Sequence, residues 1–415
     1  MNTLKGKLVL CFLVTILSAM SAMGGQTSNQ VLFKNINIFN GTDERLYKEH
    51  QLLVEGNKIK IISAGQIDIP SDTTVIDGGG RTLMPGLIDM HVHTSTFGPV
   101  QTVSRDMLHP YAHGALAADR AHGMLLNGFT TIRDLGGPAA YLRKIIDAGV
   151  IPGPRIYPTE NWITTTSGHG DFRELNDPNP NIVGGRQHFY EDLVTIIADG
   201  REEHLRAARE AFRRGATQLK VFTSGGVTSL FDPIHSGPLD EEILAVVEVA
   251  DRWDTYVAVH AHTEEAIQQA IDHGIKSIEH APYLTEDQAE LMIREGVFLS
   301  TAFAPVFSIS EETAKATYPA ESFEKWLTIR NAAKRTIEVI KANPELKVVV
   351  GSDQVPQWNT GRVYDDKAVE EFTYFAKAIG NFRTLKAFTS TAGELNMMTG
   401  KMNPYPESQL GVIKQ

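Results

Sequence analysis

Residues 83–94 read LMPGLIDMHVHT, an apolar segment that ends in two histidines separated by one residue. Side chains two positions apart in a strand point to the same face, so His91 and His93 would project side by side from a buried strand end. Two neutral imidazoles at that spacing can hold one metal ion such as zinc. This segment alone leaves one alternative open, namely two hydrogen-bonded histidines of the core.

The residues after this segment alternate between apolar strands and amphipathic helices. We expect strands near 83–93, 128–134, 154–160, 216–222, 256–262, 276–280, 296–302 and 346–353, and helices that include 202–214, 240–252 and 263–273. This alternation indicates an α/β protein with a parallel sheet, and eight such units favour a (β/α)8 TIM barrel over a doubly wound open sheet. The region 302–347 is expected to carry extra helices, and the Gly-, Asn- and Pro-rich region 164–199 to form a loop that covers a site.

Short strands and turns precede the barrel. Residues 26–82 predict a small β-sandwich companion domain, and residues 83–400 the barrel. Residues 401–415 are expected to start a return to the β domain, which we expect to be truncated because the chain stops there.

The first residues predict export. Lys5 and Lys7 precede an apolar run over 8–17 and then small residues, an order typical of a signal peptide, here 1–25. The protein would be periplasmic or secreted and would meet a membrane only through this signal, although an uncleaved anchor is the alternative. The one cysteine, Cys11, lies within the run, so the mature chain can form no disulfide. A net charge of −11 without a basic patch argues against nucleic acid as a partner.

Polar side chains recur where the later strands are expected to end, which is where a (β/α)8 barrel places its chemistry. They are Lys220, between Leu219 and Val221; the pair His260 and His262; His280; and Asp353. Each could be a satisfied buried group when taken singly, but their shared position indicates a metal site.

The chain resembles the amidohydrolase superfamily of metal-dependent hydrolases, in particular its imidazolonepropionase-like and prolidase-like branch. The matching motifs are PGLIDMHVH at 85–93, GFTTIRDLGG at 128–137, SGHGD at 167–171, QLKVFTSGGV at 218–227, VHAHT at 259–263, SIEHA at 277–281 and GSDQ at 351–354. They follow one another through most of the chain, and this order makes them jointly specific.

The resemblance implies a site with two divalent metal ions, which we expect to be zinc. His91 and His93 would bind the more buried ion together with Asp353, and His260 and His280 would bind the other. Lys220 would carry a carbamate that bridges the two ions, and a metal-bridged hydroxide would attack the amide. Asp353 would be the catalytic residue, first as general base and then as acid toward the leaving amine.

Other polar residues are assigned less directly. His169 lies in the SGHGD loop, which the resembling prolidase-like enzymes place over the site, so it would bind the substrate carboxylate or scissile carbonyl; a solvent-facing histidine is the alternative. His262 would contact the substrate or make a structural hydrogen bond. Arg133 and Asp134 are expected to pair within the barrel.

The sequence therefore predicts an exported binuclear amidohydrolase that cleaves the amide bond of dipeptides or N-acyl amino acids, with ochratoxin-like aromatic amides as a further option. The alternatives are a hydrolase of cyclic amides or lactones, an enzyme with one metal, and an exported solute-binding protein without chemistry. The sequence leaves open whether the chain forms a homo-oligomer.

Overall fold

The computed structural model describes residues 29–96, 110–173, 194–229, 237–353 and 367–415, together with Asn176, Asp177, Asn179 and Ile182. The predicted signal peptide 1–25 lies outside these residues. The chain divides into two compact units, the first up to Met84 together with Ile413–Gln415, and the second spanning Pro85–Val412. Among the described residues, no helix combines the length and the apolar character that crossing a membrane requires.

The first unit is built on one five-stranded sheet in the order β3-β2-β1-β4, with β5 also paired to β1. Its strands are β1 (Gln30–Ile38), β2 (Tyr47–Glu55), β3 (Lys58–Ser63), β4 (Thr74–Asp77) and β5 (Thr82–Leu83). Successive residues of a strand face opposite sides, so the neighbours Leu52 and Leu53 belong to two different apolar clusters. Ile413 packs against the cluster of Leu52, and its N–H donates to the carbonyl oxygen of Asn40 at 3.0 Å.

The second unit contains only parallel strand pairs among the residues described, in a three-stranded sheet β6-β7-β8 and a seven-stranded sheet β10-β9-β11-β12-β13-β14-β15. The strands are β6 (Leu87–Val92), β7 (Phe129–Asp134), β8 (Arg155–Pro158), β9 (Trp162–Thr164), β10 (Thr195–Ile197), β11 (Leu219–Phe222), β12 (Val257–Ala261), β13 (Ser277–His280), β14 (Phe298–Thr301) and β15 (Val348–Val350). Each of the eight expected strands is present, and the α/β class is confirmed.

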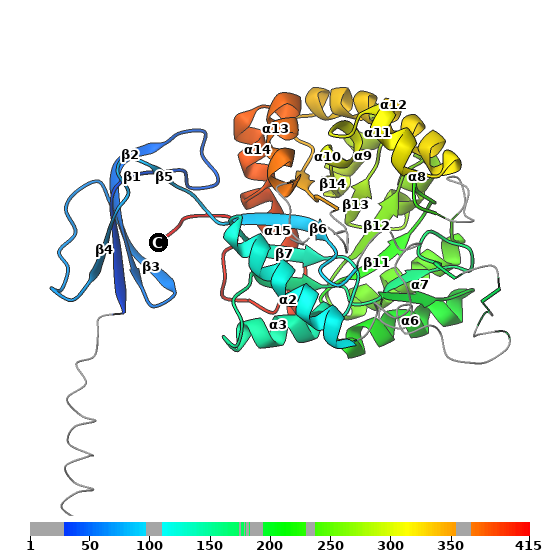
Figure 1. Cartoon of the computed structure of the whole chain (residues 1–415), viewed down its shortest axis with the longest axis horizontal. Coiled ribbons are helices and arrows are strands. Elements are labelled where there is room, and N and C mark those ends of the chain that lie inside the picture. The colour runs from blue at the N-terminus through cyan, green and yellow to red at the C-terminus, as the bar shows by residue number, and fades with distance from the viewer. Residues whose placement is uncertain are drawn as a thin grey trace, which may run out of the picture. The chain divides into compact units, whose positions relative to one another are not determined.

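Helices follow most of these strands and lie outside them (Figure 1). They are α2 (Pro110–Leu126), α3 (Ala139–Asp147), α6 (Arg201–Arg214), α7 (Asp240–Arg252), α8 (Glu264–Asp272), α9 (Glu286–Glu295), α10 (Ala304–Phe307), α11 (Glu311–Thr317), α12 (Ala320–Ala342), α13 (Lys367–Ile379), α14 (Asn381–Ala387), α15 (Ser390–Met397) and the 3-10 turn η3 (Gly400–Met402). The helices α10, α11 and α12 are the additional ones expected after β14.

Strand β6 is shorter than the sequence suggests. The expected strand from residue 83 is split, because Thr82 and Leu83 pair with β1 in the first unit. Strand β6 begins only at Leu87, after Pro85 and Gly86. A Cβ atom on Gly86 would lie 2.0 Å from Oγ1 of Thr130, so only glycine fits there.

The core of the second unit lies between the strands and the surrounding helices. Phe129, Ile132, Ile278 and Val350 are completely inaccessible to solvent, and each such side chain contributes about 1.5–3 kcal/mol. Thr263 fixes the start of α8, because its side chain accepts the N–H of Ala266. This packing holds the strand ends in fixed positions.

Two backbone hydrogen bonds link the two sheets. The N–H of Asp353, just after β15, donates to the carbonyl oxygen of His91 in β6 at 2.8 Å. The N–H of Thr217, just before β11, donates to the carbonyl oxygen of Pro158 in β8 at 2.7 Å. Strand β15 therefore lies next to β6, an edge of the three-stranded sheet, and β8 lies next to the start of β11, an inner strand of the seven-stranded sheet.

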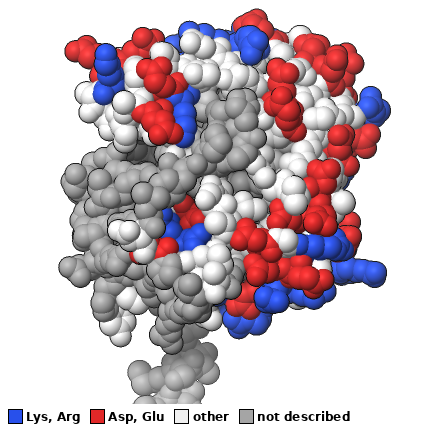
Figure 2. All heavy atoms as spheres, turned by 90° about the vertical axis from the view of Figure 1, so that its right-hand side faces the viewer, with Lys and Arg blue, Asp and Glu red and all other residues white. Residues whose placement is uncertain are grey.

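The surface drawn in Figure 2 reflects the acidic composition. Acidic side chains are spread over much of its described part, with Lys and Arg side chains among or beside them. In the described chain, acidic residues also occupy the first turns of helices, with Asp240 and Glu241 in α7 and Glu264 and Glu265 in α8. Carboxylates at these positions interact favourably with the positive end of the helix dipole.

Candidate metal centre

The predicted ligands lie at or just after the carboxyl ends of parallel strands, except that Lys220, which was expected at a strand end, is the second residue of β11. His91 is in β6 and His93 follows it directly; Lys220 is in β11; His260 is in β12 and His262 follows it; His280 ends β13; Asp353 follows β15. Ring contacts and close polar contacts join the histidines and Asp353 into one buried cluster.

The first group of candidate ligands consists of His91, His93 and Asp353. His91 donates Nδ1–H to Oε2 of Glu279 at 3.0 Å, and His93 donates Nδ1–H to the carbonyl oxygen of Gly136 at 3.4 Å. Both Nε2 atoms then carry lone pairs. They lie 3.4 and 3.3 Å from the same oxygen, Oδ1 of Asp353, which is also an acceptor. Three electron-rich atoms that converge in this way fit a bound cation.

Burial keeps the imidazoles of His91 and His280 neutral. It lowers the pKa of His91 to about 4, although the negative charge of Asp353 opposes the shift. Burial likewise lowers the pKa of His280 to about 3. A neutral imidazole is the form that binds metals, so both rings can act as ligands at neutral pH.

Glu279, a fully buried residue of β13, supports the first group. Its Oε1 accepts hydrogen bonds from Arg133 at 2.7 Å and from Ser277 at 2.6 Å, while Oε2 holds His91. Burial alone would raise the pKa of Glu279, but the charge of Arg133 and the hydrogen bond from His91 bring it well below its usual range. Glu279 is therefore a carboxylate, and it fixes both the tautomer and the orientation of His91.

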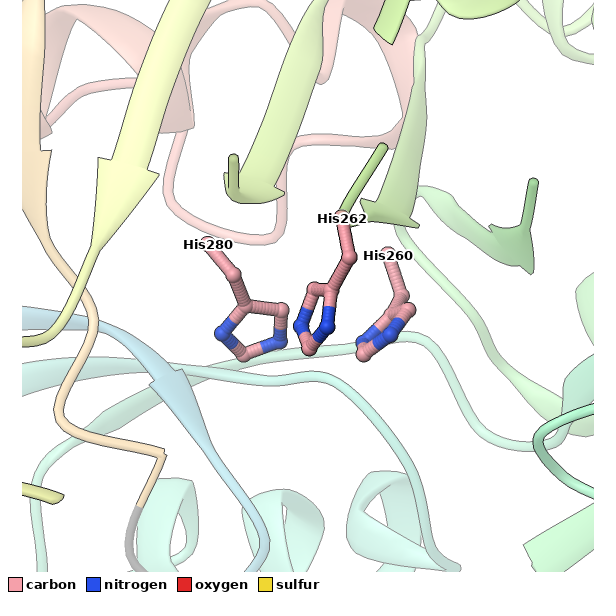
Figure 3. Close-up of side chains that lie close together, drawn as sticks. All are labelled: His260, His262 and His280. Carbon is pink, nitrogen blue, oxygen red and sulfur yellow. The ribbon is translucent and has the colours of Figure 1, made fainter. Parts of the chain in front are cut away.

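The second group consists of His260, His262 and His280, whose rings lie side by side (Figure 3). One nitrogen from each ring lies within 4.8 Å of the others, and a second such set is formed by His91, His280 and Asp353. His280 belongs to both sets, so it joins the two groups. His260 donates Nε2–H to the carbonyl oxygen of Gly225 at 3.2 Å, which leaves Nδ1 as its lone-pair donor.

Two polar atoms beside these groups have no hydrogen-bond partner among the described residues, namely Nζ of Lys220 and Nδ1 of His262. The lysine is only 1% exposed, and burial lowers its pKa to about 8. An unpartnered buried polar group is unfavourable, and it is rare in folded proteins. The residues present therefore fit a metal centre that would engage these atoms.

His169 reaches the cluster from the loop after β9. Its ring stacks on that of His260 with 4.1 Å between ring centroids, and its Nδ1 lies 2.6 Å from Oγ of Ser229. The loop is held by Asp199, which accepts hydrogen bonds from the backbone N–H and hydroxyl of Thr166 at 2.9 and 2.6 Å. The described part of the Gly-rich segment thus lies next to the candidate ligands, and His169 does not face solvent freely.

The backbone at the site is strained at two candidate ligands. His280 has a φ of 71° and Asp353 a φ of 49°, values that non-glycine residues seldom adopt. Each such residue costs on the order of 1–3 kcal/mol, and residues of this kind occur preferentially at functional sites. Gly226 meets a different constraint, because a Cβ there would lie 2.6 Å from Cε1 of His169 and 3.0 Å from His260.

Some residues of the site were not predicted from the sequence. The sequence offered one indication of a role for Glu279, namely an acidic residue within an apolar strand. Arg133 pairs with this Glu279, whereas Asp134 accepts hydrogen bonds from the backbone and hydroxyl of Thr94. No sequence pattern pointed to Ser229, because its contact with His169 joins residues that are 60 positions apart.

Comparisons with known proteins agree with this geometry. Residues 82–394 match the amidohydrolase family. The chain is 32% identical to the ochratoxinase of Aspergillus niger over 368 residues, which are 85% of this chain and 73% of the relative.

Solved structures lead to the same group of proteins. A prolidase in complex with N-methylphosphonate-L-proline superposes with a TM-score of 0.80 at 30% identity, covering 93% of this chain and 90% of the prolidase. The crystal structure of A. niger ochratoxinase gives a TM-score of 0.77 at 25% identity, covering 94% and 88%. The family match spans both groups of candidate ligands, and this chain therefore belongs to the amidohydrolase family.

Proposed function

We propose that this protein is a binuclear metal-dependent amidohydrolase that cleaves the amide bond of N-acyl amino acids, including dipeptides. Family membership makes the chain a hydrolase that acts on C–N bonds of amides. The number of metal ions, the mechanism and the substrate class are our proposal.

The observation that carries the proposal is the convergence of Nε2 of His91 and Nε2 of His93 on Oδ1 of Asp353. The Nδ1–H groups of both histidines already donate to other oxygens. Neither Nε2 atom therefore carries a proton that could be donated to Oδ1 of Asp353, and three acceptor atoms face one another. A divalent cation satisfies all three at once. We infer a second ion from the group of His260 and His280 and from the unpartnered Lys220, whose carbamate would add an anionic ligand between the ions.

Zinc is the ion that we expect, because histidine nitrogens and carboxylate oxygens suit it. When bound, a pair of such ions supplies an activated water at neutral pH and polarises a carbonyl group. The other tasks belong to the chain. Asp353 is one third exposed, so its carboxylate can take a proton from the attacking water and pass it to the leaving amine. His169 and His262 would hold the substrate.

We also infer the finer architecture that this chemistry requires. The hydrogen bonds from Asp353 to His91 and from Thr217 to Pro158 support closure of the two parallel sheets into one (β/α)8 barrel. Apolar clusters on both faces of the first unit's sheet support a small β-sandwich. The basic residues and apolar run before residue 18 support export to the periplasm or outside the cell.

The substrate class follows from what the related proteins share. One structural neighbour binds a phosphonate attached to L-proline, an analogue in which the amide carbon is replaced by phosphorus. Ochratoxinase adds ochratoxin-like aromatic amides to the compounds worth testing. Dipeptides and N-acyl amino acids combine an amide with an amino acid as leaving group.

The test is a substrate screen with zinc-loaded protein. We expect hydrolysis of at least one dipeptide or N-acyl amino acid, loss of activity after chelation, and recovery when zinc is restored. Metal analysis should give two ions per chain, and mass spectrometry of the native protein should show the mass of a carbamate. Hydrolysis confined to lactones or cyclic imides would overturn the substrate class, and one ion beside an unmodified Lys220 would overturn the binuclear site.

A further inference from the structure

Helix α12 carries a lysine next to the cluster. Nζ of Lys325 donates to the carbonyl oxygen of Ser229 at 3.3 Å, and the lysine side chain is only 14% exposed. A mostly buried ammonium is unfavourable unless it is paired. Among the described residues its ionic partner is Glu321, one helical turn earlier at 3.0 Å, but that carboxylate is 74% exposed and so binds only weakly.

Ser229 connects this lysine to the candidate metal ligands. The same serine whose carbonyl accepts from Lys325 places its Oγ 2.6 Å from Nδ1 of His169. The ring of His169 in turn stacks on that of His260. One residue, Ser229, therefore separates the ammonium from the histidine over the site.

Two other cationic side chains near the cluster have roles that leave neither of them to bind a substrate anion. Arg133 is fully buried and bound by Glu279, and Lys220 would be converted to an anion by carbon dioxide. The long flexible stem of Lys325 can move its ammonium from the exposed Glu321 toward the site. An anionic group of a substrate would be a better shielded partner than Glu321.

We propose that Lys325 binds the carboxylate of the leaving amino acid and thereby selects amides whose amine part carries an α-carboxylate. This inference rests on the proposed function and deepens it. In an extended substrate the carboxylate carbon follows the scissile carbonyl carbon by one residue, about 3.3–3.6 Å. His169 would lie near the scissile carbonyl, and Lys325 lies on the other side of Ser229. The two side chains therefore follow one another in the same order as the carbonyl and the carboxylate of such a substrate.

The test compares an N-acyl amino acid with its carboxamide, which has the same scissile bond and no negative charge. The wild-type protein should prefer the acid by about 10- to 100-fold in kcat/KM, the range expected for one hydrogen bond to a charged group. Lys325→Met should reduce that preference by the same factor, mainly through KM for the acid. Lys325→Arg keeps the charge and should restore part of it.

The matched control is Lys334→Met on the same helix. Lys334 is exposed and bonded only to Oδ1 of Asn331 among the contacts described, so the preference should stay at the wild-type value. If Lys325→Met folds poorly, inhibition of Lys325→Arg and Lys325→Gln by the free amino acid and by its amide gives the same comparison.

Three results would overturn the assignment. A wild-type preference near one would do so, as would an equal fall of kcat/KM for both substrates in Lys325→Met, which indicates a structural role. A wild-type protein with two bound metals that hydrolyses neither substrate would overturn the proposed function and this assignment with it. The first of these results, in which the wild-type protein hydrolyses both substrates at equal rates, would overturn only the assignment of Lys325.

Discussion

The two groups of candidate ligands differ in how the chain holds them. In the first group, His91 and His93 each donate Nδ1–H to a fixed oxygen, and a backbone hydrogen bond ties Asp353 to His91. In the second group, His262 and the adjacent Lys220 each keep a buried polar atom without a hydrogen-bond partner in the described chain. The first group is thus fixed by hydrogen bonds within the protein, whereas in the second group only His260 is held in this way and His262 and Lys220 are left for what binds there.

The largest effect is expected at the shared acid. Asp353→Asn should lower kcat by about 10²- to 10⁴-fold, because the amide cannot accept the proton of the attacking water. The fold should persist, since the backbone hydrogen bond of Asp353 does not involve its side chain. Steady-state kinetics with circular dichroism checks this, and activity within tenfold of the wild type would exclude Asp353 as the base.

Substitution of Glu279, which supports the first group, should lower the free energy of unfolding as well as the metal affinity. Glu279→Gln leaves Arg133 buried without its counter-charge, so the free energy of unfolding should fall by about 3–5 kcal/mol. Zinc affinity should fall by about 10- to 100-fold, because His91 loses the carboxylate that orients it. Denaturant unfolding and zinc titration measure the two quantities.

The control for Glu279 is an exposed ion pair. Glu338 and Lys341 lie 2.8 Å apart with side chains 71% and 44% exposed, and Glu338→Gln should change the free energy of unfolding by less than about 1 kcal/mol. Equal effects of the two substitutions would show that the first group is not held by Glu279.

Substitution of Lys220, beside the second group, should change the free energy of unfolding in the opposite direction. Burial that lowers the pKa of Lys220 from 10.5 to about 8 costs the metal-free protein about 3 kcal/mol at pH 7. Lys220→Met, of similar volume, should therefore raise the free energy of unfolding of the metal-free protein by about that amount while abolishing hydrolysis.

The pH dependence follows from the same shift. Between pH 8 and 10.5 the unfolded chain binds the lysine proton and the folded chain does not, so wild-type stability rises with pH. The gain from Lys220→Met should accordingly shrink over this range. Urea unfolding in chelator at several pH values tests it, and a Met variant less stable than the wild type at pH 7 would refute the contrast.

The smallest effect is expected at His262, whose Nδ1 has no hydrogen-bond partner among the residues that the structure describes and so can meet a substrate. His262→Asn should raise KM about tenfold, the value of one hydrogen bond, with two metal ions still bound. Kinetics and metal analysis on the same sample decide the role. Loss of one ion would make His262 a ligand of the second group instead of a substrate contact.

The sequence was sufficient for the elements that repeat a pattern. Apolar strands that end in polar residues predicted the eight expected parallel strands and the strand-end positions of His91, His260 and Asp353, whereas Lys220 lies within β11. Short strands with little pattern, such as β9 and β10, fell partly within the region expected to be a loop. Strand β6 was placed too early because pairing of Leu83 with β1 depends on tertiary contacts.

The contacts that arrange the site could not be read from spacing. Glu279 and Arg133 are 146 residues apart, and Ser229 is 60 residues from His169. No local pattern links such residues, since only the folded sheet brings them together. The sequence thus predicted ligand types and strand ends, but not the tautomers or the supporting carboxylate.

The return of Ile413 to the first unit has a consequence for biosynthesis. Its N–H bonds to Asn40, a residue that leaves the ribosome 373 positions earlier. At about 5–20 residues per second, the early sheet waits roughly 20–75 s for this last contact. During that interval β1 to β5 lack the contact from Ile413 while the chain between them emerges, so a chaperone would meet the N-terminal strands before this contact exists.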